Sequence, residues 1–310
     1  MNHLRRAARG GIALGALLTA AALAATLAGC SPDTDRVQPA SVAQQVLIYP
    51  DVSVVENLAY GTDPAQQLDV CQPADAETSS VNNGPRRAVI SVHGGSWREG
   101  DKASVHWRSV CEWLASEGFV AFSLNYRLAP SAPFPAAISD VHAAIDWLRQ
   151  PAQADAYGYD PALIGAFGGS AGGNLVALLG ASGTGPWDVG TRVAAVVELS
   201  APIDLTTAGD YPAEFAQYQL DYLGCDDYVG CPSARDASPQ FAVDPTDPPV
   251  FVAHSRDEFI PPAQGEILVE SLKANGIEHV HVEVPGAAHS IGMLDDALRG
   301  QIVEFLRAHL

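Results

Sequence analysis

The sequence predicts an α/β fold, with a mostly parallel central sheet and helices on both of its faces. Two observations predict it. Short apolar runs of strand length alternate along the chain with longer amphipathic runs of helix length. Glycine-rich or polar motifs directly follow several of the apolar runs, as expected at the carboxyl ends of parallel strands, where such folds carry their functional sites. The 310 residues are enough for one large domain to bury a stable core without needing disulfides or a bound metal.

The first 45 residues precede this alternation and are expected to export and tether the protein. Three arginines among the first nine residues are followed by an apolar run over 11–28, the order of an export signal. Residues 27–30, Leu-Ala-Gly-Cys, resemble the lipobox of bacterial lipoproteins. This resemblance implies that 1–29 are removed and that Cys30 is lipidated. Residues 30–45, rich in Pro, Ser, Gln and Asp, then form a flexible tether.

We therefore expect the protein on the extracytoplasmic face of the bacterial cell envelope, held to the membrane by its N-terminal lipid. A plain signal peptide or a membrane anchor is the alternative, but Ala and Thr dominate the run where a spanning helix would carry Leu and Ile.

The predicted domain covers residues 46–310. Residues 46–60 and 67–72 alternate in polarity around the turn 61–64 and are expected to form antiparallel strands at one sheet edge. Further strands are expected at 88–92, 119–124, 163–167, 193–199, 250–253 and 279–284, and helices at 105–117, 133–148, 175–181, 263–275 and 294–310. Residues 206–247, rich in aromatic and acidic side chains, break the alternation, and we expect them to be a lid or substrate-lining insertion.

The composition excludes some partners and favours disulfides. A formal net charge of −19 repels nucleic acid and anionic headgroups, so we expect no nucleic-acid partner. Outside the cytosol, the even number of cysteines after Cys30 favours disulfides. Cys225 and Cys231 are the easiest to join, and Cys71 with Cys111 follows by elimination. A single C-x5-C spacing is not that of a zinc site, so we expect no metal.

A serine lies at the junction of a predicted strand and a predicted helix. The spacing around Ser170 is G-x-S-x-G, and these small residues let the backbone turn sharply and lift the hydroxyl out of the sheet. The amide of Ala171, at the start of the helix, has no intrahelical partner and can bind an oxyanion. A phosphate cradle is the alternative, but the Walker lysine and the dinucleotide-fingerprint spacing are both missing.

A second glycine motif follows the predicted strand 88–92. Gly94 and Gly95 expose adjacent amides with no side chains in the way, which is what stabilising an oxyanion requires. The alternative is a structural turn beside a core histidine. We interpret His93 as a residue that fixes this loop by hydrogen bonding, not as a proton-transfer base.

A serine nucleophile needs a base, and the base needs an acid. Asp257 follows the predicted strand 250–253, and His289 lies in a small-residue loop after the next strand. The chain order Ser, Asp, His is that of α/β-hydrolases rather than of chymotrypsin. Glu258 follows Asp257, so either carboxylate can face the imidazole. The weaker competitors are His279 and His281, which alternate within a predicted strand, and Asp204, which lies one strand too early.

Five motifs in order carry a family resemblance. They are His-Gly-Gly-Ser-Trp at 93–97, Gly-Asp-Lys at 100–102, Asn-Tyr-Arg-Leu-Ala-Pro at 125–130, Phe-Pro-Ala-Ala at 134–137 with Asp140, and Gly-Gly-Ser-Ala-Gly-Gly at 168–173. Over roughly 55–310 the chain resembles α/β-hydrolases of the carboxylesterase type, near the hormone-sensitive-lipase-like and BD-FAE-like esterases. The usual His-Gly-x-x-Asp after the acid strand is His-Ser-Arg-Asp here.

The resemblance implies the α/β-hydrolase fold, with a small insertion before the acid strand, and a set of site residues. Asp257 is preferred over Glu258 because its offset from the strand end fits the family pattern. The implied roles are nucleophile for Ser170, general base and acid for His289, orienting acid for Asp257, and oxyanion hole for the amides of Gly94, Gly95 and Ala171.

The predicted function is hydrolysis of carboxylic esters through an acyl-enzyme, without metal or organic cofactor. We expect a carboxylesterase acting on small-molecule esters with short to medium acyl chains, with ester cleavage faster than amide cleavage. The alternatives are an arylformamidase, whose version of the glycine motif is similar, or an acetyl or feruloyl polysaccharide esterase. The alternative from another functional class is a catalytically inactive, lipid-anchored binding protein with the same fold. Idle relatives commonly lose the serine or histidine, and both are present here.

Overall fold

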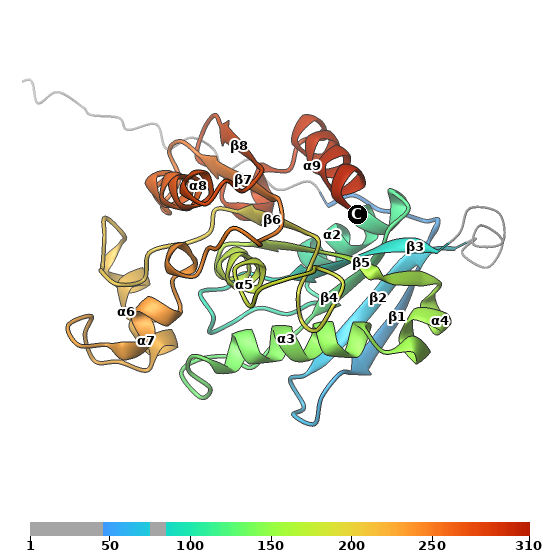
Figure 1. Cartoon of the computed structure of the whole chain (residues 1–310), viewed down its shortest axis with the longest axis horizontal. Helices are drawn as coiled ribbons and strands as arrows, with labels where there is room; N and C mark the ends of the chain where they lie inside the picture. Colours follow the sequence, from blue (N-terminus) through green and yellow to red (C-terminus); the bar gives the residue numbers. More distant parts are fainter. Residues whose placement is uncertain (1–45, 75–84) are drawn as a thin grey trace, which may run out of the picture. The chain divides into compact units, whose positions relative to one another are not determined.

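The structure is a computed structural model that describes residues 46–74 and 85–310 (Figure 1). The described residues belong to one unit, which covers 41–310. The predicted leader, lipidated Cys30 and tether lie outside the described residues. Among the helices that the structure describes, none combines the length and the hydropathy needed to cross a membrane.

Within the described residues, one eight-stranded sheet forms the centre of the fold. Its strands are β1 (Val52–Ala59), β2 (Gln67–Pro73), β3 (Arg86–Val92), β4 (Val120–Leu124), β5 (Tyr159–Gly169), β6 (Ala195–Leu199), β7 (Val250–Ser255) and β8 (His279–Val284). Their spatial order is β1-β2-β4-β3-β5-β6-β7-β8. β2 is antiparallel to both β1 and β4, and all other pairs are parallel. The mostly parallel sheet with an antiparallel edge is therefore confirmed.

Helices cover both faces of the sheet (Figure 1). The helical segments are α2 (Val105–Ser116), α3 (Ala136–Leu148), α4 (Pro151–Tyr157), α5 (Ala171–Gly180), α6 (Ala213–Leu223), α7 (Pro232–Asp236), α8 (Ala263–Ala274) and α9 (Asp296–His309), with the 3₁₀ helices η1 (Pro239–Phe241) and η2 (Ser290–Met293). Successive residues of β3 face opposite cores, because side chains alternate along a strand. Ile90 packs in the core shared with α3, α5 and α8, and Val89 packs in the core shared with α2 and α9.

The central strands are mostly apolar because both of their faces are covered. Every residue of β4, β6 and β7 is buried. The parallel register aligns their carboxyl ends: Val92 pairs with Gly168, Gly169 with Leu199, and Ser255 with Val284. The loops that follow β3, β5, β6, β7 and β8 therefore leave the same edge of the sheet, where the sequence predicts the site.

Two disulfides join described segments, and both predicted pairings are confirmed. Cys71 and Cys111 connect β2 to α2, with their Cα atoms 5.8 Å apart. Cys225 and Cys231 close the turn between α6 and α7. Residues 206–247, between β6 and β7, carry α6, α7 and η1, which lie to one side of the sheet in Figure 1.

Candidate active site

Ser170 occupies a sharp turn between β5 and α5. Its backbone has φ +57° and ψ −126°, a strained combination for a residue with a side chain, and its amide donates to Leu199 O at 2.8 Å. The glycines on either side are required by space: a Cβ on Gly168 would collide with Gly172 O, and one on Gly172 would collide with Val92 O. The turn therefore has the geometry that G-x-S-x-G predicts.

Ser170 opens into a cavity of about 440 Å³ at the carboxyl edge of the sheet. The structure brings Gly94, Gly95 and His289 to the walls of the same cavity, and Ala171 begins α5 beside it. The approach of the glycine loop is close, because a Cβ on Gly94 would lie 3.0 Å from Ser170 Cβ. The complete lining is Gly94, Gly95, Ser96, Glu99, Gly100, Ser104, Trp107, Ser170, Phe259, His289, Ser290 and Ile291.

His93 is buried behind the glycine loop and fixes it. Its Nδ1 donates to Gly94 O at 2.8 Å, its ring stacks on Tyr126 at 4.5 Å, and the Tyr126 hydroxyl donates to His93 O at 2.9 Å. Burial lowers the pKa of His93 to about 4, so its imidazole is neutral at neutral pH. The interpretation of His93 as a loop-fixing residue is confirmed.

The carboxylate that meets His289 is Glu258. His289 Nδ1 donates to Glu258 Oε2, which leaves Nε2 free to accept a proton. The Glu258 side chain is fully buried, whereas Asp257 is exposed to solvent. The structure therefore corrects the assignment of Asp257 as the acid. The family pattern His-Gly-x-x-Asp, counted from His254, places its acid at position 258, so the expectation of Asp257 was one residue short. The turn after β7 is closed by Ser255 N, which donates to Glu258 Oε1 at 2.9 Å.

Ser200, at the end of β6, links the acid to the histidine loop. Its hydroxyl donates to Glu258 Oε1 at 2.7 Å and accepts the amide of Ser290, next to His289, at 2.8 Å. Ser200 is fully buried and has a positive φ of 54°. Sequence reasoning missed this residue, because one serine after a buried strand carries no distinguishing signal.

Comparison with known proteins identifies the family. Residues 68–272 match the family model BD-FAE, about two thirds of the chain. The chain belongs to the BD-FAE family. Esterase LipC of Mycobacterium tuberculosis is 36% identical over 252 residues, which are 78% of this chain and 60% of LipC. The probable carboxylic ester hydrolase LipM of the same organism is 28% identical over 261 residues, 81% of this chain and 59% of LipM. The chain thus spans about 60% of the length of these two relatives.

Solved structures share the fold of this BD-FAE chain. A truncated carbohydrate esterase from gut microbiota superposes with a TM-score of 0.72 at 24% identity, covering 83% of this chain and 96% of that one. Esterase B from Lactobacillus rhamnosis superposes with a TM-score of 0.71 at 22% identity, covering 86% and 87%. The fold is therefore that of the α/β-hydrolases.

The other walls of the cavity that holds Ser170 carry aromatic side chains and one carboxylate. The Phe259 ring lies 4.4 Å from the His289 ring and is 42% exposed. Trp107, from α2, and Ile291, from η2, add apolar surface. Glu99 contributes a carboxylate, and the described lining contains no lysine or arginine. The cavity therefore combines an apolar surface with one carboxylate.

The weaker candidates for the base and the acid lie away from the cavity. His279 and His281 are in β8, paired with Val250 and Val252, and Asp204 accepts hydrogen bonds from Thr206. None of the three lines the cavity. In the part of the chain that the structure describes, no group of three or more His, Cys, Asp or Glu side chains is arranged to hold a metal ion.

A second histidine and carboxylate pair is buried near the acid. His254 Nε2, in β7, lies 3.3 Å from Glu198 Oε1, in β6, and both side chains are fully buried. Burial by itself lowers the pKa of His254, but the Glu198 carboxylate outweighs burial and the net shift is upward. This pair lies outside the cavity lining and supports the strands beneath the site.

Proposed function

We propose that the protein is a serine hydrolase that cleaves carboxylic esters through an acyl-enzyme on Ser170. The observation that carries the proposal is the hydrogen bond between His289 and buried Glu258, at the wall of the cavity that also holds Ser170 and the glycine loop. The names of the relatives LipC and LipM, an esterase and a probable carboxylic ester hydrolase, agree with it.

The proposed reaction follows from the roles of these groups. His289 Nε2 takes the proton of Ser170 Oγ as this oxygen attacks the ester carbonyl carbon. The carbonyl oxygen becomes an oxyanion, which accepts hydrogen bonds from the amides of Ala171 and the glycine loop. His289 then protonates the leaving alkoxide, and the C–O bond to the alcohol breaks. Water, deprotonated by His289, attacks the acyl-enzyme and releases the acid and the serine.

Glu258 stabilises the imidazolium that forms in both halves of the reaction. A buried carboxylate is costly unless its oxygens are satisfied, and here both oxygens have partners. Ser200 Oγ and Ser255 N donate to Oε1, and His289 donates to Oε2. The acid is therefore held in one orientation before the substrate binds.

The proposed substrates are esters of short to medium acyl chains. The cavity is open and about 440 Å³ in volume, and Trp107, Phe259 and Ile291 give it apolar surface. An acyl ester on a carbohydrate is the second candidate, because the hydroxyls of Ser96 and Ser104 line the same cavity and can bond sugar hydroxyls.

A series of p-nitrophenyl esters from acetate to decanoate tests the proposal. We expect hydrolysis by the wild type with a maximum at short to medium chains, and its loss in Ser170→Ala. No hydrolysis by the wild type would favour an idle binding protein, and hydrolysis that persists in Ser170→Ala would misplace the nucleophile. Parallel assays on acetylated xylan and on N-formyl aniline separate the polysaccharide esterase and formamidase alternatives.

We also propose that Cys30 carries a lipid that holds the domain on the outer side of a bacterial membrane. The proposal is supported by the Leu-Ala-Gly-Cys sequence after an apolar run. In the natural host, Cys30→Ala should move the protein from the detergent-soluble membrane fraction to the aqueous fraction. Unchanged membrane fractionation of Cys30→Ala would contradict a lipid anchor at this residue.

A further inference from the structure

The loop between β3 and α2 carries unusual backbone strain next to the candidate nucleophile. Gly95, Ser96 and Trp97 all have positive φ, at 122°, 52° and 57°. Residues with side chains keep such conformations only where the surrounding structure over-determines them. Trp97 is fully buried and stacks on Tyr222 at 4.3 Å, which fixes the middle of the loop. The end of the loop nearest α2 is held by other contacts.

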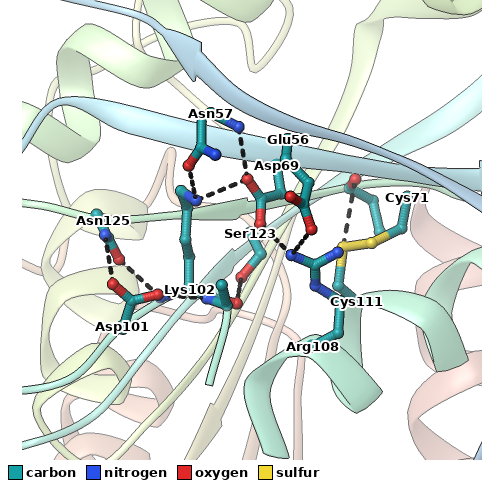
Figure 2. Close-up of polar contacts among 12 residues, drawn as sticks. Glu56, Asn57, Asp69, Cys71, Asp101, Lys102, Arg108, Cys111, Ser123 and Asn125 are labelled. Atoms are coloured by element: carbon teal, nitrogen blue, oxygen red, sulfur yellow. Dashed lines mark hydrogen bonds and ion pairs between the residues drawn. A yellow bond between two sulfur atoms is a disulfide. The ribbon is translucent and has the colours of Figure 1, made fainter. Parts of the chain in front are cut away.

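Lys102 makes these contacts through its main chain and its side chain. Its amide donates to Asn125 Oδ1 at 2.6 Å, and its carbonyl accepts Ser123 Oγ at 3.2 Å. Its ammonium lies 2.7 Å from Asp69 Oδ1 and donates to Asn57 Oδ1 at 2.8 Å. Figure 2 shows the Lys102 side chain reaching from the loop to the strands of the sheet edge.

Asp69 joins the loop exit to the helix that follows it. Its second oxygen accepts Arg108, in α2, at 2.6 Å, and Arg108 also bonds Glu56 at 2.9 Å. The cluster of these four side chains therefore contains two cations and two carboxylates. Asp69 is fully buried and Lys102 is 3% exposed. Because neither lines the cavity, they do not touch substrate.

The disulfide Cys71–Cys111 ties the same strand to the same helix. Cys71 lies two residues after Asp69 in β2, and Cys111 lies three residues after Arg108 in α2, so the ion pair and the disulfide join matching faces of the two elements. Figure 2 shows the disulfide beside Arg108. Strand β2 and helix α2 are thus held together at two adjacent points.

We propose that Asp69, Lys102, Arg108 and the Cys71–Cys111 disulfide form a clamp that keeps the oxyanion amides aligned with Ser170. Lys102 is a positioning residue in this clamp and acts through the loop. The inference rests on the proposed ester hydrolysis. An oxyanion hole works only when its donors are already aimed at the developing charge. A loosened clamp therefore weakens binding of the transition state and leaves binding of the ground-state ester nearly unchanged.

The test compares Lys102→Met with Arg192→Met. Arg192 also belongs to a buried ion pair, 3.6 Å from Asp247, but neither of these residues lines the cavity or contacts the loop. The measurements are kcat and KM for p-nitrophenyl butyrate, the inhibition constant of butylboronic acid, which forms a tetrahedral adduct with serine, and the melting temperature. For Lys102→Met we expect kcat to fall about 10- to 100-fold, a smaller loss than the removal of a donor, with KM within about twofold and boronate affinity falling in parallel with kcat.

The control fixes the interpretation. Arg192→Met should lower the melting temperature while kcat and boronate affinity stay at wild-type values. If Lys102→Met behaves like Arg192→Met, Lys102 is merely structural and the proposal is overturned. A wild type that hydrolyses no ester would instead refute the proposed function, and the clamp with it.

Two milder changes keep the test decisive if Lys102→Met does not fold. Ser123→Ala removes one hydrogen bond to Lys102 O and should lower kcat about threefold at unchanged KM, in line with the modest net value of one hydrogen bond. The double variant Cys71→Ala/Cys111→Ala removes the disulfide of the clamp, and Cys225→Ala/Cys231→Ala removes the other disulfide. We expect the first double variant to lower kcat and boronate affinity more than the second. Wild-type kcat in Ser123→Ala, together with equal effects of the two disulfide removals, would overturn the clamp.

Discussion

Replacing Glu258 by Gln removes the charge that faces His289 and keeps the size of the side chain. The Glu258 side chain is fully buried, so solvent screens its attraction for the imidazolium only weakly. With about 4 Å between the charge centres and an effective dielectric constant of about 20, this attraction is about 4 kcal/mol. The imidazolium forms as Ser170 loses its proton, so losing this attraction raises the barrier by about 4 kcal/mol, which corresponds to about a 10³-fold decrease in kcat.

The assay is the steady-state hydrolysis of p-nitrophenyl butyrate, with Asp257→Asn as the matched control. Asp257 is exposed, and its main-chain amide donates to Gly286 O at 3.0 Å. We expect Asp257→Asn to keep kcat within about twofold, because exposed charges contribute little. A large loss in Asp257→Asn together with an active Glu258→Gln would refute the reasoning and restore the aspartate as the acid.

Three further predictions concern groups around the site. Ser200→Ala removes a hydrogen bond to the charged Glu258 and should lower kcat about tenfold at constant KM; wild-type kcat would contradict this role. Burial lowers the pKa of His93 from 6.5 to about 4. Between pH 6.5 and pH 4 the unfolded state therefore binds one proton that the folded state does not. The free energy of unfolding falls as the pH decreases through this range, by at most about 3 kcal/mol. Urea denaturation at pH 6.5 and 4.5 should show a smaller decrease in His93→Gln than in the wild type, and equal decreases would count against this assignment. Glu99→Gln should raise kcat/KM for p-nitrophenyl hemisuccinate relative to the neutral butyrate, because a cavity carboxylate repels anionic esters; an unchanged ratio would show that Glu99 does not face the substrate.

The central strands of the sheet were predictable because both of their faces are buried. Such strands are mostly apolar runs bounded by turn residues. β4, β6 and β7 have this form, and so does β3 from Ala88 onward. The first part of β5 was missed. Residues 159–162, Tyr-Asp-Pro-Ala, have no strand pattern, and their extended form depends on the pairing of Tyr159 with Arg86. Helix α4 was also missed, because its seven residues are too short to show periodicity.

The candidate site was predictable where glycine motifs mark strand ends. Ser170, His289 and the glycine loop meet at one cavity because parallel strands end at one edge. The acid was predicted one residue too early, at Asp257, although the His-Gly-x-x-Asp spacing counted from His254 ends at Glu258. The structure decides between these neighbours because Asp257 N donates to Gly286 O in the loop after β8, while the Glu258 side chain is buried against His289. The sequence alone does not contain these long-range contacts.

The central claim is that Ser170 is a nucleophile activated by His289, and covalent labelling tests it most directly. The protein is treated with a fluorescent p-nitrophenyl phosphonate, digested, and the modified peptide is sequenced by mass spectrometry. We expect one adduct on Ser170, absent from Ser170→Ala and formed much more slowly by His289→Ala. An unlabelled wild type, or an adduct on another residue that persists in Ser170→Ala, would contradict the account.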